Sequence, residues 1–514
     1  MDILKGKYIE LAIALWLLPV LQTFGQFSFS AEGYVFEKEY DSRMILTGFQ
    51  PQSQIWGRQL LRVPASVIYE GEKYEVVGID SKAFLGLTTV KSIVIEDGVE
   101  WIEDYAFEGC VNLKSIYIPA SVEDIGKGLF SNCYQLTEIV VDSLNVCYDS
   151  REQSNAIIDS ENNTLHAGCL TTKIPASVTA IGERAFYNCS MLEDLVIPEN
   201  VESIGRSAFS GCGSLKRLIL PNSLKEIDAD AFCFCSSLQS VRIPKNVCSI
   251  HEGNVFRGCY NLNGIEVDAA NRFYDSRSGC NGIVRKSDSA LIATCRMTKI
   301  CEGIQVLGDN CFCGTIISSV TLPKSVVVIS YEAFRHCYGI DALDVETGNM
   351  SYMSPQGSNA ILTKDGKTLV LGCRNTIIPD GVREIGEYAF CGRYNSPILR
   401  FPDGLRTIRG SAFVNCNMSG IHIPDSVTFI GPNAFEGCQY LTVVKMSSSS
   451  LESIQSGTFS GCGNLSIVQL PEGLKSIGKH AFKDCGSLKN VYIPSSVTSV
   501  AEDAFLNCPA SNQE

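Results

Sequence analysis

The chain has 514 residues, of which 45% are hydrophobic, and its formal net charge is −14. This acidic balance, without any run of five basic residues, excludes the electrostatic attraction on which binding to nucleic acid or to anionic membrane surfaces usually depends. Length alone would predict about three or four globular domains, but an internal repeat favours a single elongated one.

The N-terminus is typical of a secretory signal peptide. Two lysines precede an aliphatic run from Leu11 to Leu21, and Thr23-Phe24-Gly25 follows as a small-residue cleavage site. The run is short for a membrane span, although Glu10 beside it leaves an uncleaved anchor as the alternative. We predict a signal peptide over 1–25, export to the extracellular space or the cell surface, and no membrane span after the signal is removed.

Residues 26–78 predict an N-terminal cap and an irregular first repeat. Apolar runs at 34–36, 44–46 and 61–63 are separated by polar residues, and Pro64 ends the last of them. These runs indicate a hairpin that leads into the first coil. The end of a repeat array needs a surface unlike its interior, which this segment is expected to supply.

From residue 79 onward one phrase recurs, Ala-Phe-x-x-Cys-x-x-Leu-x-x-Ile-x-Ile-Pro-x-Ser-Val-x-x-Ile, which is complete between Ala106 and Ile125. Its marker phenylalanines are 22 to 24 or 56 residues apart. They are Phe84, Phe107, Phe130, Phe186, Phe209, Phe232, Phe256, Phe312, Phe334, Phe390, Phe413, Phe435, Phe459, Phe482 and Phe505. This period predicts a leucine-rich repeat solenoid over 79–514, with coils of about 23 residues that bury their apolar sides against one another.

Each coil contains one predicted strand. Leu113, Ile116 and Ile118 are apolar at alternating positions, and Pro119 ends the run because it has no backbone N–H to donate. We expect successive strands to form one parallel β-sheet. The remainder of a coil is too short for a crossover helix, so irregular or briefly helical return segments are expected. The strand pattern recurs at 192–198, 215–221 and 488–494.

Three intervals of 56 residues predict long coils near 137–175, 263–301 and 341–379. Each contains an asparagine and a second asparagine ten residues later. An apolar run follows the second asparagine, then turn residues, then a further apolar run that ends in cysteine. This order is typical of an ordinary coil that carries an inserted β-hairpin. The first asparagines are Asn145, Asn271 and Asn349.

The repeated phrase, with Ile-Gly before its Ala-Phe, resembles the BspA-type leucine-rich repeat of bacterial surface proteins, and the resemblance covers Leu61 to Cys508. The long coils are similar to those of that family as well. The resemblance implies an exported, non-enzymatic adhesion or recognition protein, whose relatives bind host matrix proteins or other bacteria. It implies no catalytic set, and it maps no binding residues.

The 23 cysteines predict buried free thiols. Twelve of them lie three residues after a marker phenylalanine, at one fixed position of the coil. Leu87, Thr315 and Arg393 take this position in other coils, which suits a packing position better than a bonded pair. Because exported proteins normally form disulfides, some pairing among the cysteines outside this position stays open. Those candidates are Cys233, Cys248, Cys280, Cys301, Cys311, Cys313 and Cys391.

The sequence indicates neither catalysis nor metal binding, and we predict no enzyme and no cofactor. Cys233 and Cys235, like Cys311 and Cys313, are closer together than the ligands of structural zinc usually are. The five histidines fall in different coils and phases, so no pair of nucleophile and base is indicated. Stacked coils bring distant residues together, so a hydrolase with an unrecognised carboxylate pair stays an alternative.

The outward side chains of the predicted strands are the candidate binding surface, because successive coils present them in register. The candidates are Lys114, Tyr117, Glu193, Asp194, Lys216, Arg217, Gln239, Arg242, Lys489 and Tyr492. Simple solvation of the sheet also explains each of them, and the hairpins are a rival site. We expect protein partners. A glycan-binding or capture protein of the same fold is the alternative, although only Trp56 and Trp101 follow the signal as tryptophan platforms.

Overall fold

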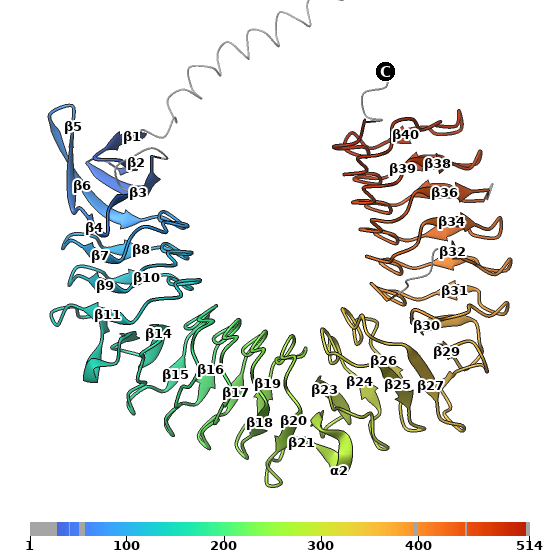
Figure 1. Cartoon of the computed structure of the whole chain (residues 1–514), viewed down its shortest axis with the longest axis horizontal. Helices are drawn as coiled ribbons and strands as arrows, with labels where there is room; N and C mark the ends of the chain where they lie inside the picture. The colour runs from blue at the N-terminus through green and yellow to red at the C-terminus, as the bar shows by residue number, and fades with distance from the viewer. Residues whose placement is uncertain (1–27, 41, 51–56, 394–397, 448–449, 510–514) are drawn as a thin grey trace, which may run out of the picture. The chain divides into compact units, whose positions relative to one another are not determined.

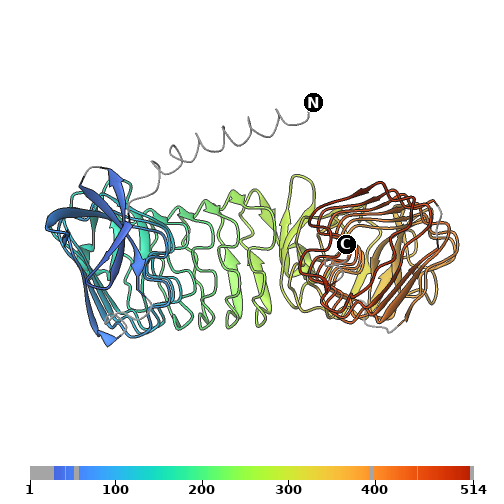
Figure 2. The same cartoon turned by 90° about the horizontal axis from the view of Figure 1, so that it is seen from above.

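The computed structural model describes residues 28–40, 42–50, 57–393, 398–447 and 450–509. The predicted signal peptide and Trp56 lie outside these residues. The chain divides into two compact units, residues 1–213 and 214–514. Within each unit short coils are stacked one on the next (Figures 1 and 2). Within the described ranges, no helix is long and apolar enough to cross a bilayer.

A sheet of mixed direction forms the start of the first unit. Its strands are β1 (Ser28–Ala31), β2 (Tyr34–Tyr40), β3 (Arg43–Phe49), β5 (Ser66–Tyr69) and β6 (Glu72–Ile79). The first three are antiparallel, β3 pairs in parallel with β6, and β5 forms a hairpin with β6. Tyr34 meets the ring of Phe84 edge to face at 6.4 Å, and Phe49 stacks on the same ring at 6.5 Å. Aromatic side chains of this sheet therefore pack against the first marker phenylalanine.

Two rows of parallel strands follow in the first unit. The Ile-x-Ile phrases form β4 (Leu60–Val63), β7 (Ser92–Ile95), β9 (Ser115–Ile118) and β11 (Glu138–Val141). The ends of the Val-x-x-Ile phrases form β8 (Trp101–Ile102), β10 (Asp124–Ile125), β15 (Ala180–Ile181) and β16 (Ser203–Ile204). The isoleucine side chains of both rows are buried. The Ala-Phe-x-x-Cys segments between the rows are turns.

The second unit has the same two rows, whose neighbouring strands pair in parallel. The Ile-x-Ile strands are β18 (Ser240–Ile243), β20 (Gly264–Val267), β25 (Ser319–Leu322), β27 (Ala342–Val345), β32 (Ile398–Leu399), β34 (Gly420–Ile423), β36 (Val443–Met446) and β38 (Ile467–Gln469). The two-residue strands are β17 (Glu226–Ile227), β19 (Ser249–Ile250), β24 (Val306–Leu307), β26 (Val328–Ile329), β31 (Glu384–Ile385), β33 (Thr407–Ile408), β35 (Phe429–Ile430), β37 (Ser453–Ile454), β39 (Ser476–Ile477) and β40 (Ser499–Val500).

The three predicted hairpins are confirmed, one in each long coil. Each consists of two antiparallel strands joined to a short third one, and its last strand pairs in parallel with the next two-residue strand. The strands are β12 (Tyr148–Asp149), β13 (Ala156–Asp159), β14 (Thr164–Gly168), β21 (Tyr274–Asp275), β22 (Gly282–Arg285), β23 (Ala290–Thr294), β28 (Tyr352–Met353), β29 (Ala360–Thr363) and β30 (Thr368–Gly372). In two of the long coils a short helical turn, η2 (Arg151–Gln153) or α2 (Arg277–Cys280), lies between the first and second of these strands.

A buried asparagine explains why the long coils repeat one another. The Nδ2 group of Asn349 donates to the carbonyls of Pro323 (2.8 Å) and Val326 (3.1 Å) in the preceding coil. Its Oδ1 accepts the backbone N–H groups of Ser351 and Tyr352, each at 2.8 Å. Asn145 and Asn271 make the same four bonds. An amide with two donors and an acceptor is the side chain that this position requires.

The predicted single sheet differs from the structure, in which the Ile-x-Ile strands form several short ladders. The ladders end at the long coils. The Ile-Pro segment that follows each hairpin lies in turns, and its backbone N–H groups donate to the hairpin segment instead of to a neighbouring strand. Lys173, Lys299 and Ile377 donate their N–H groups to Ser154, Cys280 and Ser358 at 2.9 Å. The predicted strands at 192–198 and 215–221 have buried apolar side chains but an irregular backbone, and at 488–494 only a bridge between Tyr492 and Gln469 remains.

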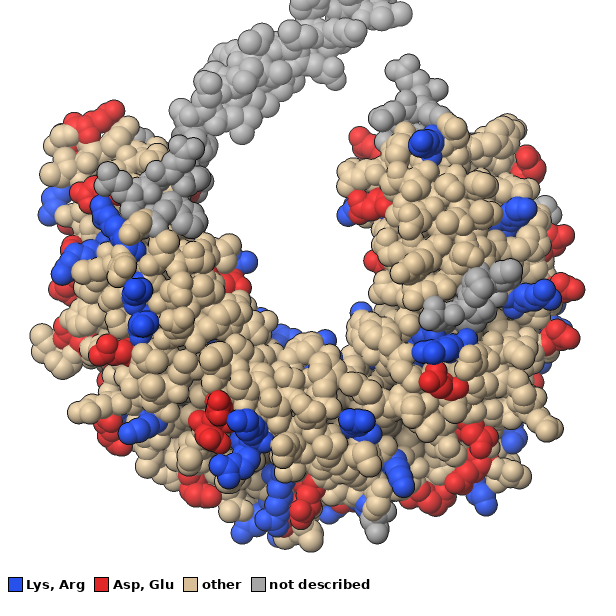
Figure 3. Space-filling model, viewed as in Figure 1, with Lys and Arg blue, Asp and Glu red and all other residues tan. Residues whose placement is uncertain are grey.

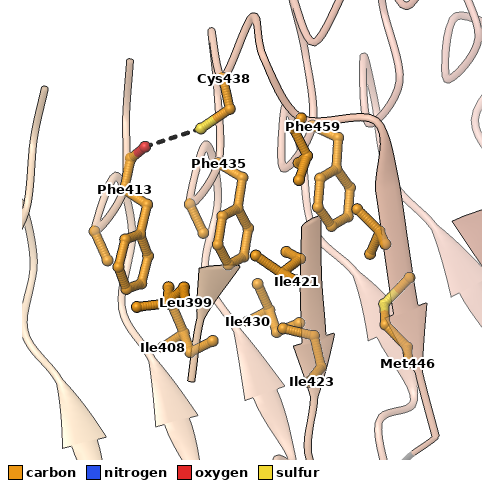
Figure 4. Close-up of a cluster of buried hydrophobic side chains, with 14 of the residues drawn as sticks. Leu399, Ile408, Phe413, Ile421, Ile423, Ile430, Phe435, Cys438, Met446 and Phe459 are labelled. Carbon is orange, nitrogen blue, oxygen red and sulfur yellow. Dashed lines mark hydrogen bonds between the residues drawn. The ribbon is translucent and has the colours of Figure 1, made fainter. Parts of the chain in front are cut away.

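The marker phenylalanines form the centre of the core (Figure 4). Phe413, Phe435 and Phe459 stack with centroids 5.2 and 5.5 Å apart and are fully buried. After the first and third long coils the next ring packs on a glycine instead, since a Cβ on Gly168 or Gly372 would lie about 2 Å from the following marker ring. Stacked aromatic rings of this size supply much of the burial that holds neighbouring coils together.

The cysteines three residues after the markers are buried, as predicted, and all 23 thiols are free. The Cys438 thiol donates to the carbonyl of Phe413, the marker of the preceding coil, at 3.1 Å (Figure 4). Other coils repeat this bond. Where Arg393 replaces the cysteine, its Nη1 donates to the equivalent carbonyl of Phe334 at 2.7 Å. In most coils this position therefore supplies a buried donor toward the preceding coil, whereas the buried Leu87 of the first coil only packs.

Candidate binding surfaces

The ten predicted binding residues all lie outside the core. Nine are exposed, and Tyr117 is half-buried. They do not gather at one place. Lys114, Tyr117, Glu193 and Asp194 belong to the first unit, and the other six belong to the second, where Lys489 and Tyr492 follow only after many further coils.

Tyr117 and Arg242 are engaged by their own chain. The Tyr117 hydroxyl donates to the Asp142 carboxylate, and this bond raises the pKa of Tyr117 to about 12. Arg242 pairs with Asp268 at 3.0 Å and with Glu266 at 3.6 Å. Exposed ion pairs of this kind contribute little to stability, so Arg242 stays accessible to a competing partner.

A continuous outward row in the second unit was only partly predicted. His422, Lys445, Gln469 and Tyr492 occupy paired positions on successive coils and are all exposed. Their backbones are about 4.8 Å apart at each step, as in any sheet. A hollow of about 490 Å³ adjoins His422, with Arg400 and Phe401 also lining it. On the face that Figure 3 shows, basic and acidic residues are intermixed and much of the surface is uncharged.

The buried thiols are poor candidates for chemistry. Burial raises the pKa of Cys110, Cys189 and Cys337 to about 12, so these groups stay protonated at neutral pH and are weak nucleophiles. Within the described ranges, no group of three or more His, Cys, Asp and Glu side chains is placed to hold a metal ion.

Comparison with known proteins identifies the family to which these repeats belong. The model of the BspA type leucine rich repeat region matches six copies over residues 73–155, 162–278, 292–356 and 372–485. The chain belongs to the BspA-type leucine-rich repeat family. The resemblance seen in the sequence is thereby confirmed. No protein of curated function is matched.

Several solved structures that are similar to this BspA-type protein come from bacteria. A leucine rich cell surface protein from Faecalibacterium prausnitzii is 22% identical, with a TM-score of 0.39, and the match covers 95% of this chain and 94% of that one. A leucine-rich repeat protein from Bacteroides ovatus is 23% identical, with a TM-score of 0.33, covering 91% and 95%. One from Eubacterium ventriosum is 14% identical, with a TM-score of 0.34, covering 95% and 97%.

Sequence reasoning missed a second surface of this BspA-type protein, on the Ala-Phe-x-x-Cys turns of the second unit. A groove of about 350 Å³ lies over four of these turns. Phe234, Tyr260, Ile316 and Tyr338 line it and are each about half exposed, together with Arg257 and His336. The available signal was the residue two places after the marker, which is Gly, Asn or Asp in the other thirteen coils but Phe234 and His336 here.

Proposed function

We propose that this chain is an exported, non-enzymatic adhesion or recognition protein that binds macromolecular partners through the outward side chains of its Ile-x-Ile strands. The observation that carries this proposal is the register of His422, Lys445, Gln469 and Tyr492 over four coils. Membership of a family of repeat proteins supports it. Host matrix proteins and the surface proteins of other bacteria are the partners we favour.

The row suits a protein partner because it combines the residue types that anchor interfaces. Tyr492 is 72% exposed and presents a large ring with a polar tip. Lys445 and His422 add donors on the neighbouring coils, and the adjoining hollow gives the surface relief. A partner that spans several coils would collect many weak contacts in fixed register, which is how repeat proteins reach affinity and specificity.

The test is a pull-down of the mature protein against immobilised extracellular-matrix proteins and cell-surface glycans, followed by variants. The double variant Lys445→Ala with Tyr492→Ala should weaken binding to the captured protein by about tenfold or more. Glu472→Ala is the matched control, because Glu472 is exposed in the turn that follows Gln469.

Two results would overturn the proposal. Binding unaffected by the double variant would remove the strand row from the interface. A purified chain that bound neither proteins nor glycans but turned over a substrate would identify an enzyme.

A further inference from the structure

The groove on the Ala-Phe-x-x-Cys turns contains a backbone conformation that its side chains do not favour. The residue two places after the marker has a positive φ in all fifteen coils. Glycine, asparagine or aspartate occupies it in thirteen of them, and these types reach the left-handed region at least cost. Phe234 and His336, both at φ 59°, are the exceptions. Both line the groove.

The solenoid itself imposes this conformation. The N–H of Phe234 donates to the carbonyl of Arg257 in the next coil at 2.7 Å, and Gly109 and Gly437 make the same bond at 2.8 Å. A bulky aromatic residue in the left-handed region is strained. Tyr105 and Tyr388 also have a positive φ, two places before their markers, so the strain points to the groove only together with its lining. Phe234 is also 44% exposed, so core packing does not explain it.

The equivalent turns beside the first long coil are a built-in comparison. Small residues occupy four of the groove positions in those turns. Phe234, Arg257, His336 and Tyr338 correspond there to Gly109, Ser131, Gly211 and Gly213, respectively. Only Tyr134 retains the aromatic type of its counterpart, Tyr260. The same architecture thus forms without the groove residues, and their presence in the second unit is not a requirement of the fold.

The groove walls are aromatic and apolar, with contacts that hold them in place. The Phe234 ring covers Gly258, where a Cβ would lie 2.4 Å from the ring. The Arg257 guanidinium lies 5.2 Å from the centroid of Phe234 and pairs with Asp230 at 3.1 Å. Nδ1 of His336 is 2.6 Å from the Tyr338 hydroxyl. These contacts fix the orientation of the side chains that line the groove.

The basic side chains that line the groove are Arg257 and His336. Among the described residues that line it, Arg257 and His336 are the ionisable groups besides tyrosines, and no Asp, Glu, Asn or Gln takes part. Burial and then the charges of Arg335 and Arg257 lower the pKa of His336. Arg257 pairs with Asp230 and Arg335 with Glu332, so a carboxylate of the ligand would share or replace Asp230 at Arg257.

We propose that this groove binds a polypeptide segment in which an aromatic side chain adjoins a carboxylate, with the ring on Phe234, Tyr260 and Tyr338 and the carboxylate toward Arg257. The volume is at the lower limit of ligand pockets and suits one large side chain with its neighbour. The walls are half exposed, as suits a segment laid over four turns rather than an enclosed small molecule. Sugars are disfavoured because the lining lacks the carboxylate and amide groups that would bind their hydroxyls.

The test uses the whole mature protein and labelled heptapeptides in a Gly-Ser context. The central residue is Trp, Phe, Leu or Ala, and both its neighbours are Glu, Lys or Ser. Fluorescence polarisation should show saturable binding below about 1 mM, strongest for Trp between two Glu. Phe234→Gly should weaken that binding by about tenfold or more, and Arg257→Gln should remove the preference for Glu over Lys.

The controls separate the groove from the strand row and from misfolding. Tyr260→Ala should weaken peptide binding, whereas Tyr134→Ala, its counterpart in the first unit, should not. Phe234→Gly introduces the residue type that eight other coils use, so it should remain folded by circular dichroism. The Lys445→Ala, Tyr492→Ala variant should bind the peptide normally, so failure of the proposed function and failure of the groove are distinguishable.

Three outcomes would overturn the inference. They are the absence of saturable binding by every peptide, equal binding of the Glu and Lys series, and retention of full affinity by Phe234→Gly. An oligosaccharide that bound in a manner sensitive to Phe234→Gly, in the absence of peptide binding, would assign the groove to glycans instead.

Discussion

The residue two places after each marker phenylalanine shows how a repeated backbone restricts side-chain choice. Its φ is positive in all fifteen coils, and in most of them its N–H donates to a carbonyl of the next coil, so the sequence follows the conformation rather than the reverse. Glycine dominates the position, and a Cβ costs free energy even where space is available.

Gly86 and Phe234 allow this conformational cost to be measured. The space around a Cβ on Gly86 is open and its φ is +68°, so Gly86→Ala should lower the free energy of unfolding by about 1–2 kcal/mol through backbone strain alone. Phe234→Gly should leave the free energy of unfolding unchanged or raise it by up to about 1 kcal/mol, because the relief of backbone strain offsets the lost contacts of the phenyl ring.

Phe429 is the matched control for the second substitution. It is 40% exposed, as Phe234 is 44% exposed, but it lies in β35 with an ordinary strand backbone. Phe429→Gly should therefore lower the free energy of unfolding by about 1–2 kcal/mol in urea titrations. Equal losses for the two phenylalanines would contradict the strain at Phe234.

At the scale of the element, the long coil depends on one amide. Asn349 is fully buried and makes four hydrogen bonds to backbone groups of two coils. Asn349→Ala leaves those groups without their partner and should cost about 3 kcal/mol or more. Asn246→Ala, which removes one bond from an exposed side chain, should cost less than about 1 kcal/mol.

Chemical denaturation of the two asparagine variants checks this expectation, and hydrogen exchange locates the damage. Exchange should rise first in β28 and β29, the strands that follow Asn349. Similar losses for Asn349→Ala and Asn246→Ala would mean that the hairpin, not the amide, holds the long coil in place.

The hairpins and the core were predictable because their patterns are local and repeated. Asn349 and its equivalents recur at a fixed spacing, and the marker phenylalanines define the period. The division of the sheet was not predictable in the same way. Residues 170–175 carry an Ile-Pro ending like any other coil, but the N–H of Lys173 bonds to Ser154 in the hairpin. Such competition between partners is a tertiary effect.

For the binding surfaces too, the local pattern was predictable and the tertiary arrangement was not. Exposure of the ten candidates followed from the alternation of the strand phrase, and nine of them are exposed. The groove depends on turns that are far apart in the chain, since the long coil separates Tyr260 from Ile316 in sequence while both line one surface. Sequence spacing alone does not reveal which turns meet.

At the scale of the whole molecule, the buried thiols make stability sensitive to alkali. Burial raises the pKa of Cys110, Cys189, Cys337 and Cys485 from 9.0 to about 12. The folded protein therefore keeps these protons while the unfolded chain releases them. The contribution of each buried thiol to the free energy of unfolding is present in full below about pH 9. It is lost as the pH rises toward 12, by about 1.4 kcal/mol per pH unit for each thiol.

Urea denaturation between about pH 8 and pH 11 measures this dependence. Cys110→Ser is the control, since its hydroxyl can donate to the Phe84 carbonyl as the thiol does but does not titrate in this range. The variant should show a shallower loss of stability with pH. A stability that stays flat up to pH 11 would contradict the burial of the thiols.

Because neighbouring ordinary coils all meet through the same contacts, a gene of this family can gain or lose a whole coil without creating a mismatched contact. Phe413, Phe435 and Phe459 meet their neighbours through the same stacking and the same thiol bond, so excision or duplication of one repeat rejoins faces that already match. The long coils lack this interchangeability, because each asparagine is fitted to the coil before it. Recombination would thus vary the spacing between hairpins while leaving their own surroundings unaltered.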